Sequence, residues 1–152
     1  MNVSKLAKVF AAVSALMIVA SAANAADSVT VTVNANINGV CKFFTAAPVV
    51  TIANSGANID PSSATTATGN ADITYRCSNG TSPVFVVPAT ASINNGAAIM
   101  VASISSTNGG AGTGMGAAQG KTLNVVGSIA QAGFENAPAG AYSGTMTVTV
   151  TP

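Results

Sequence analysis

The fold of this chain is decided by a stretch in which apolar and polar residues alternate: Ala141-Tyr142-Ser143-Gly144-Thr145-Met146-Thr147-Val148-Thr149-Val150-Thr151-Pro152. Its larger apolar residues, Tyr142, Met146, Val148 and Val150, fall on one face of an extended backbone, and the threonines fall on the other. Successive side chains of a β-strand point to opposite faces of the sheet, so a period of two predicts a strand with one buried face. We therefore predict a β-strand over residues 141–152.

A second alternating stretch runs from Asp27 to Ile37. One face carries Val29, Val31, Val33, Ala35 and Ile37, and the other carries Ser28, Thr30, Thr32, Asn34 and Asn36. The pattern predicts another strand, followed by a turn or bulge at Asn38-Gly39. This strand can be the first strand of its own sheet, as first strands usually are, or it can be lent to another molecule.

Shorter segments between these two stretches also have the character of strands. We predict them at residues 48–53, 71–77, 84–87, 97–104 and 122–129. The polar residues 54–69 and the Gly- and Ala-rich residues 107–120 are predicted loops, and residues 78–81 are a turn of the hairpin kind. No helical period follows residue 25, so the predicted fold class is all-β, with short strands packed as a sandwich.

Residues 1–25 fit a secretory signal peptide. Lys5 and Lys8 precede an apolar run over residues 9–20, and a small-residue A-x-A pattern predicts cleavage between Ala25 and Ala26. The 127 residues that remain suffice for one domain. They carry three basic and four acidic residues, which argues against a nucleic-acid partner because phosphate binding requires a dense basic surface. So few charges also suggest that neighbouring molecules cover much of the surface.

The chain contains two cysteines, Cys41 and Cys77. A signal peptide directs the protein to an oxidising compartment, where a disulfide between them is favoured. A redox pair is the weaker interpretation, because the two cysteines are far apart in the sequence and form no C-x-x-C motif. Closing a loop of this length contributes about 3–4 kcal/mol in the chain-entropy model.

Three segments resemble the major pilins of the chaperone-usher pathway, within the spore coat protein U or archaic class. They are the alternating N-terminal strand that leads to Gly39-Val40-Cys41, residues 73–81 (Ile-Thr-Tyr-Arg-Cys-Ser-Asn-Gly-Thr), and the stretch from Ala139 to Val150. The resemblance implies an immunoglobulin-like fold that lacks its last strand. It also implies a periplasmic chaperone, an outer-membrane usher, and polymerisation of identical subunits by donor-strand exchange.

On this interpretation, residues 26–38 are the donor strand, with Val29, Val31, Val33, Ala35 and Ile37 buried in the neighbour. Residues 39–152 are the pilin domain, and Tyr142, Met146, Val148 and Val150 lie on the strand at the edge of its acceptor groove. The expected location is a pilus at the cell surface, reached through the periplasm, and the expected role is adhesion or biofilm formation.

We predict no enzymatic activity and no metal or cofactor. The sequence has no histidine, the disulfide would use both cysteines, and the four acids are scattered, so no catalytic constellation assembles readily. Two other function classes stay open. One is a self-complete β-sandwich secreted as a coat or matrix protein. The other is an adhesin domain that binds a surface ligand, although an adhesin of this pathway typically has a receptor domain as well as a pilin domain.

Overall fold

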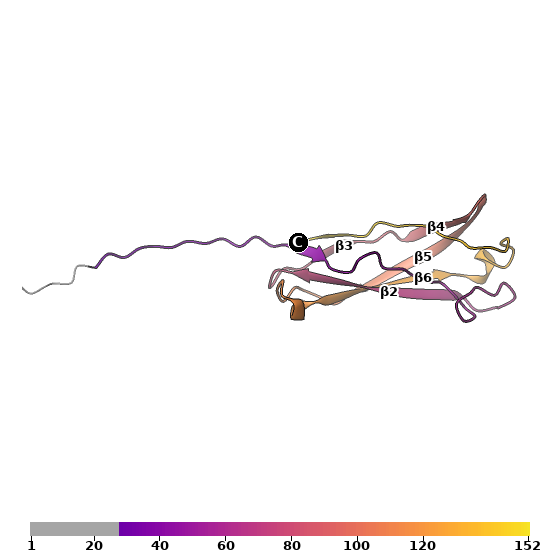
Figure 1. Cartoon of the computed structure of the whole chain (residues 1–152), viewed down its shortest axis with the longest axis horizontal. Coiled ribbons are helices and arrows are strands. Elements are labelled where there is room, and N and C mark those ends of the chain that lie inside the picture. Colours follow the sequence, from indigo (N-terminus) through magenta and orange to yellow (C-terminus); the bar gives the residue numbers. More distant parts are fainter. Residues whose placement is uncertain (1–27) are drawn as a thin grey trace, which may run out of the picture. The chain divides into compact units, whose positions relative to one another are not determined.

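A computed structural model describes residues 28–152 (Figure 1). The predicted signal peptide and its cleavage site at Ala25 and Ala26 lie outside the described residues. The chain divides into one unit that ends at Asn36 and a second unit over Ile37–Pro152, which holds all the described strands. No helix among residues 28–152 is long and apolar enough to cross a membrane.

The second unit consists of seven strands and two short 3₁₀ helices. They are β1 (Cys41–Phe43), β2 (Ala67–Cys77), β3 (Val84–Val86), β4 (Thr90–Asn95), β5 (Ala98–Asn108), η2 (Ala117–Gln119), β6 (Lys121–Ile129), η3 (Gln131–Gly133) and β7 (Thr149–Thr151). Five strands form an antiparallel sheet in the order β1-β2-β6-β5-β4, and β3 pairs with β7 in a small second sheet. The all-β class is confirmed.

The long strands form where small, β-branched and apolar residues alternate with polar ones. In β6, Leu123, Val125, Gly127 and Ile129 are buried on one face, and the residues between them are half-buried. In β2, Ile73 and Tyr75 are buried in the same way. Side chains of this type fit the pleated, half-buried surface of a sheet, so sequence and structure agree for these two strands.

The strands define two ends of this unit. At one end, which we call the proximal end, β1 begins, β2 ends opposite it, β6 begins, and β7 lies beside β1. At the other end, the distal end, Ala67 of β2 pairs with Ile129 of β6, so the loops 54–66 and 130–140 lie there. Figure 1 shows the sheet curling along its length between these two ends.

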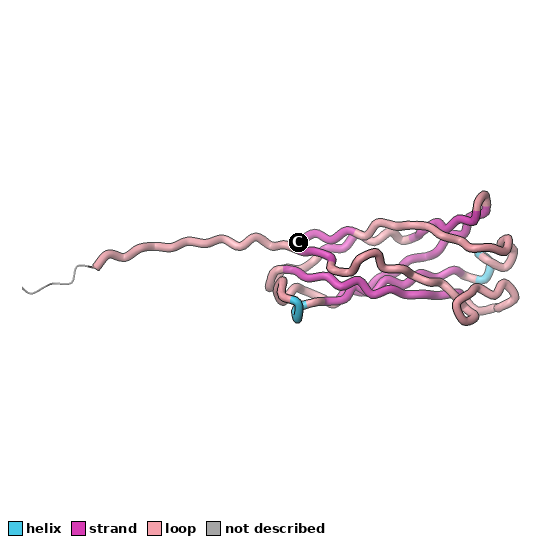
Figure 2. Tube along the Cα trace, in the orientation of Figure 1, coloured by secondary structure: helices cyan, strands magenta, loops and turns pink. Residues whose placement is uncertain are grey.

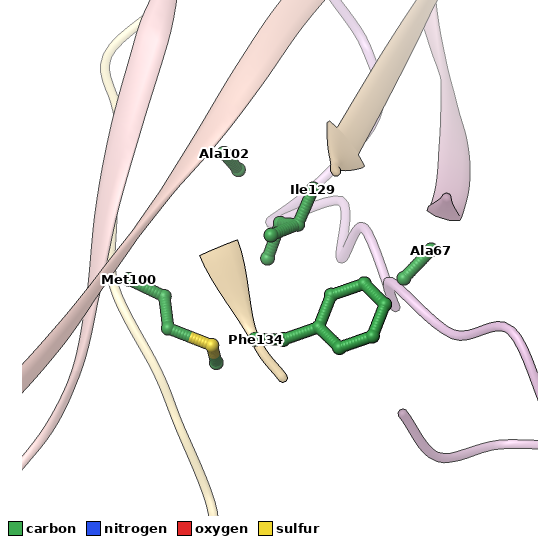
Figure 3. Close-up of a cluster of buried hydrophobic side chains, with 5 residues drawn as sticks. All are labelled: Ala67, Met100, Ala102, Ile129 and Phe134. Carbon is green, nitrogen blue, oxygen red and sulfur yellow. The ribbon is translucent and has the colours of Figure 1, made fainter. Parts of the chain in front are cut away.

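Two clusters of buried side chains make up the core. The distal cluster contains Ala67, Met100, Ala102, Ile129 and Phe134 (Figure 3). The proximal cluster contains Ile73, Tyr75, Cys77, Leu123 and Val125, with Phe85 packed edge-on against Tyr75. Ile104 packs against both clusters and joins them. No polar or charged side chain among the described residues is fully buried, so apolar packing stabilises this core.

The predicted disulfide is confirmed. Cys41 of β1 and Cys77 of β2 are direct partners in the register, with Cα atoms 4.1 Å apart, and their sulfurs are bonded. Gly112 of the loop after β5 lies against this bridge, and a Cβ atom there would stand only 2.5 Å from the Cβ atom of Cys77. The loop therefore covers the bridge closely only because residue 112 is a glycine.

Several predicted strands differ from the structure. Residues 28–40 contain no strand (Figure 2), residues 48–53 form only an isolated bridge at Ala53, and within residues 141–152 only β7 is a regular strand. A segment is a regular strand only when a neighbouring strand lies at hydrogen-bonding distance from its backbone. An alternating sequence pattern does not by itself provide that neighbour. β1 and β4 were not predicted from the sequence.

The predicted turn at residues 78–81 is present, because the Thr81 N–H donates to the Ser78 carbonyl at 3.0 Å and Gly80 has a φ of 77°. It does not close a hairpin, however. β2 pairs with β1 and β6, whereas β3 pairs with β7 in the other sheet. The chain therefore crosses from one sheet to the other at this turn.

Candidate interaction groove

Two adjoining hollows lie along the second unit, with volumes of about 580 and 510 Å³. They share Val49, Val50, Ile52, Ile93 and Gly144, so they form one groove. Its floor is apolar and comes from β2, β4, β5 and the segment after η3: Ala71, Ile73, Ala91, Ile93, Met100, Ala102, Ile104 and Phe134. Phe134 and Met100 belong to the distal core cluster in Figure 3, so the groove opens directly onto the core.

The first edge of the groove is residues 46–52. The chain follows β2 as far as Phe44, whose N–H donates to the Thr74 carbonyl at 2.8 Å, and it rejoins β2 only at Ala53, which pairs with Thr68. Thr45 contributes to this departure, because its Oγ1 atom accepts from the Thr74 N–H at 2.7 Å. Within residues 28–152, the backbone of residues 46–52 makes no hydrogen bond.

The second edge of the groove is residues 144–148. Ser143 exchanges two backbone hydrogen bonds with Asn94 of β4, and pairing resumes at Thr149, opposite Val86. Between these points the backbone has no hydrogen-bond partner in the described part of the chain. Gly144 passes so close to β4 that a Cβ atom would stand 2.1 Å from the Ser92 carbonyl oxygen, so this position requires glycine.

The two edges run in opposite directions. Residues 46–52 run from the proximal toward the distal end, because Phe43 lies opposite Tyr75 and Ala53 lies opposite Thr68. Residues 144–148 run back from the distal end toward β7. Two strand edges with free N–H and C=O groups, separated by an apolar floor, are the arrangement that accepts an added β-strand.

The lining of the groove excludes a charged ligand. Among the described residues that line it, none is charged, and the polar side chains are those of three threonines, Ser143, Asn58 and Tyr142. A charged side chain placed there would lose its hydration without gaining a partner. The groove is therefore suited to an extended, uncharged segment with apolar side chains on one face.

Two of the four residues predicted for the groove edge line its proximal hollow, namely Met146 and Val148. Tyr142 lines the distal hollow, and its hydroxyl donates to the Pro138 carbonyl at 2.9 Å. Val150 lies instead opposite Phe85 in the β3–β7 pair. The opposite edge, residues 46–52, was missed as an edge, and the only sequence signal for it was Pro48, which cannot donate to a ladder.

The residues predicted for the donor strand are among the most exposed apolar side chains of the described chain. The exposed fractions are 86% for Val29, 73% for Val31, 85% for Val33 and 88% for Ile37, and Ala35 is also exposed. Fully burying a valine or isoleucine side chain contributes about 1.5–3 kcal/mol. A segment with this exposure gains stability wherever it finds an apolar groove to bind.

Asp60, Asp72 and Tyr75 lie apart from one another and have separate hydrogen-bond partners. Asp60 accepts hydrogen bonds from the hydroxyl and N–H groups of Ser62, and these bonds lower its pKa. Asp72 instead accepts from the Asn124 amide at 2.7 Å. The Tyr75 hydroxyl donates to the Gly110 carbonyl at 2.7 Å, and burial raises its pKa. Within residues 28–152, no group of three or more metal-ligating side chains lies together.

Comparison of the chain with protein-family models, with curated proteins and with solved structures found no match.

Proposed function

We propose that this protein is the structural subunit of a surface fibre, in which residues 27–37 of one copy fill the groove of the next. The observation that carries the proposal is the uncharged groove between residues 46–52 and 144–148, whose two edges lack backbone partners in the described chain. The exposed alternating segment that bears Val29, Val31 and Val33 has the chemistry that this groove requires.

An immunoglobulin-like sandwich without its last strand accounts for the groove. In such a sandwich the last strand pairs with the strand before it, and residues 144–148, which lead into β7, have the place of that neighbour in the chain order. The Tyr142 hydroxyl, bonded to the carbonyl four residues upstream, has the geometry of the tyrosine corner of this fold.

Assembly on a surface follows from the same proposal. A subunit whose groove is empty exposes apolar side chains and unpaired backbone, so it requires a periplasmic chaperone until an outer-membrane usher passes it to the growing fibre. The finished homopolymer serves attachment or biofilm growth. Neither an enzymatic activity nor a cofactor forms part of the proposal.

Charged substitutions on the two faces of the donor segment test the proposal. Val31→Asp with Val33→Asp places two carboxylates against the uncharged groove, and we expect polymers of the otherwise unchanged protein to disappear. Thr30→Asp with Thr32→Asp adds the same charge to the opposite face, and polymers should persist. Sedimentation velocity measures the size of the species that each variant forms. If both double variants polymerised, or neither did, the proposal would be contradicted. If the unaltered protein and all variants were monomeric at every concentration, a self-complete coat protein would be favoured.

A further inference from the structure

The charged side chains of the second unit are sorted to its two ends. Lys42 and Arg76 are cross-strand partners in β1 and β2, and Lys121 lies opposite Tyr75, so the three cations lie together at the proximal end. Asp60, in the loop before β2, and Glu135, after η3, lie at the distal end. The unit therefore has a cationic end and an acidic end.

These two ends do not neutralise each other within one molecule. The eleven residues of β2 span most of the distance between them, and a strand of this length measures about 35 Å. Salt screens charges beyond about 8 Å at physiological ionic strength. The remaining acid of this unit, Asp72, lies at the middle of β2 and is hydrogen-bonded to Asn124.

The cations have no anionic partner in the described chain. No carboxylate within residues 28–152 forms an ion pair with Lys42, Arg76 or Lys121. The Arg76 guanidinium lies over the Phe44 ring, 4.0 Å from its centroid, and its buried Nε atom has no hydrogen-bond partner. Within residues 28–152, the carboxylates of Asp60 and Glu135 accept hydrogen bonds only from the neighbouring Ser62 and Asn136. Both ends thus keep their charge available for another molecule.

We propose that the acidic distal end of one copy binds the cationic proximal end of the next copy at each joint of the fibre. This proposal rests on the proposed function. The donor segment is covalently joined to β1, which begins at the proximal end, so the acceptor copy must lie beyond that end. When the segment runs antiparallel to residues 144–148, its C-terminal end leaves the acceptor groove at the distal end. The cations of one copy then face Asp60 and Glu135 of the other.

The opposite insertion is disfavoured by the same charges. A segment that ran parallel to residues 144–148 would leave the groove at the acceptor's proximal end, and two cationic ends would meet. Like charges brought together cost free energy, whereas complementary charges increase the rate of association. The charge distribution therefore favours one direction of strand insertion and one order of subunits.

Charge reversal in the full protein tests this contact. In 20 mM NaCl we expect Asp60→Lys with Glu135→Lys to slow fibre growth about tenfold, because electrostatic attraction no longer accelerates the association of two copies. Adding Lys42→Glu and Lys121→Glu to the same chain should restore growth, and 0.5 M NaCl should remove the difference between the variants. Asp72→Asn, which removes an acid from the middle of the sheet, is the control and should grow at the unaltered rate.

The outcomes separate this contact from the strand exchange. Fibres that grow equally fast in the unaltered and charge-reversed proteins would overturn the end-to-end contact and leave the proposed function standing. Slow growth without recovery in the fourfold variant would also overturn it, because the loss would then not be due to charge complementarity. The absence of fibres from the unaltered protein would overturn both proposals.

Discussion

A chain that begins at Asn38 is expected to stay monomeric at concentrations at which the chain that begins at Ala26 assembles into fibres. The shorter chain keeps the groove but loses the alternating segment with Val29, Val31, Val33, Ala35 and Ile37. With four or five apolar side chains at about 1–3 kcal/mol each, and backbone hydrogen bonds added to them, this segment supplies most of the energy of a joint. Electron microscopy and sedimentation velocity distinguish fibres from monomers.

The control for this deletion keeps the length and composition of the segment. A variant in which residues 28–36 hold the same amino acids in an order without alternation should also fail to assemble, because its apolar side chains no longer share a face. Fibres formed by the shortened chain would show that residues 26–37 are not the element that joins the subunits.

Replacing both cysteines, Cys41→Ser with Cys77→Ser, should produce a large loss of stability. The bridge closes a loop with a sequence separation of 36 residues, and its removal lowers the free energy of unfolding by about 3–4 kcal/mol. The total free energy of unfolding of a small domain is only about 5–15 kcal/mol. A domain with an open groove also lacks part of its core contacts.

Urea unfolding measures this loss. The midpoint is expected to fall by about 2 M urea, if the slope of the free energy of unfolding against urea concentration stays unchanged. The two cysteines are direct partners in β1 and β2, so the bridge ties these two strands together. An unchanged midpoint would mean that the pairing of β1 with β2 does not depend on the bridge. The disulfide would then contribute little to keeping the first edge of the groove in place.

The parts of the fold that were predictable from the sequence are those with a strong local pattern. The strand expected at residues 122–129 is β6 (Lys121–Ile129), and the strand expected at residues 71–77 is the second half of β2. The cysteine pair was predictable because the predicted signal peptide implies an oxidising compartment. In each case the alternation or the chemistry lies within a few consecutive residues.

The groove itself was not predictable in this way. It exists because residues 46–52 leave the edge of β2 and residues 144–148 stay clear of them. The second of these is a relation between segments about one hundred residues apart, which no local pattern reports. The pattern at residues 141–152 identified the inward face with Met146 and Val148, but only Thr149–Thr151 found a ladder partner. β4 was missed because its short run of Ala, Ser, Ile and Asn carries a weak apolar signal.

The central claim, that the groove is completed by the strand of residues 27–37, is tested most directly by thermal melting of the chain that begins at Asn38, with and without a peptide of residues 27–38. At a peptide concentration one hundred times Kd, binding adds about 2.7 kcal/mol, which corresponds to a rise in Tm of about 10 °C for a domain of this size. The same peptide with Val31→Asp and Val33→Asp should produce no rise. A Tm that does not respond to the unaltered peptide would contradict the account.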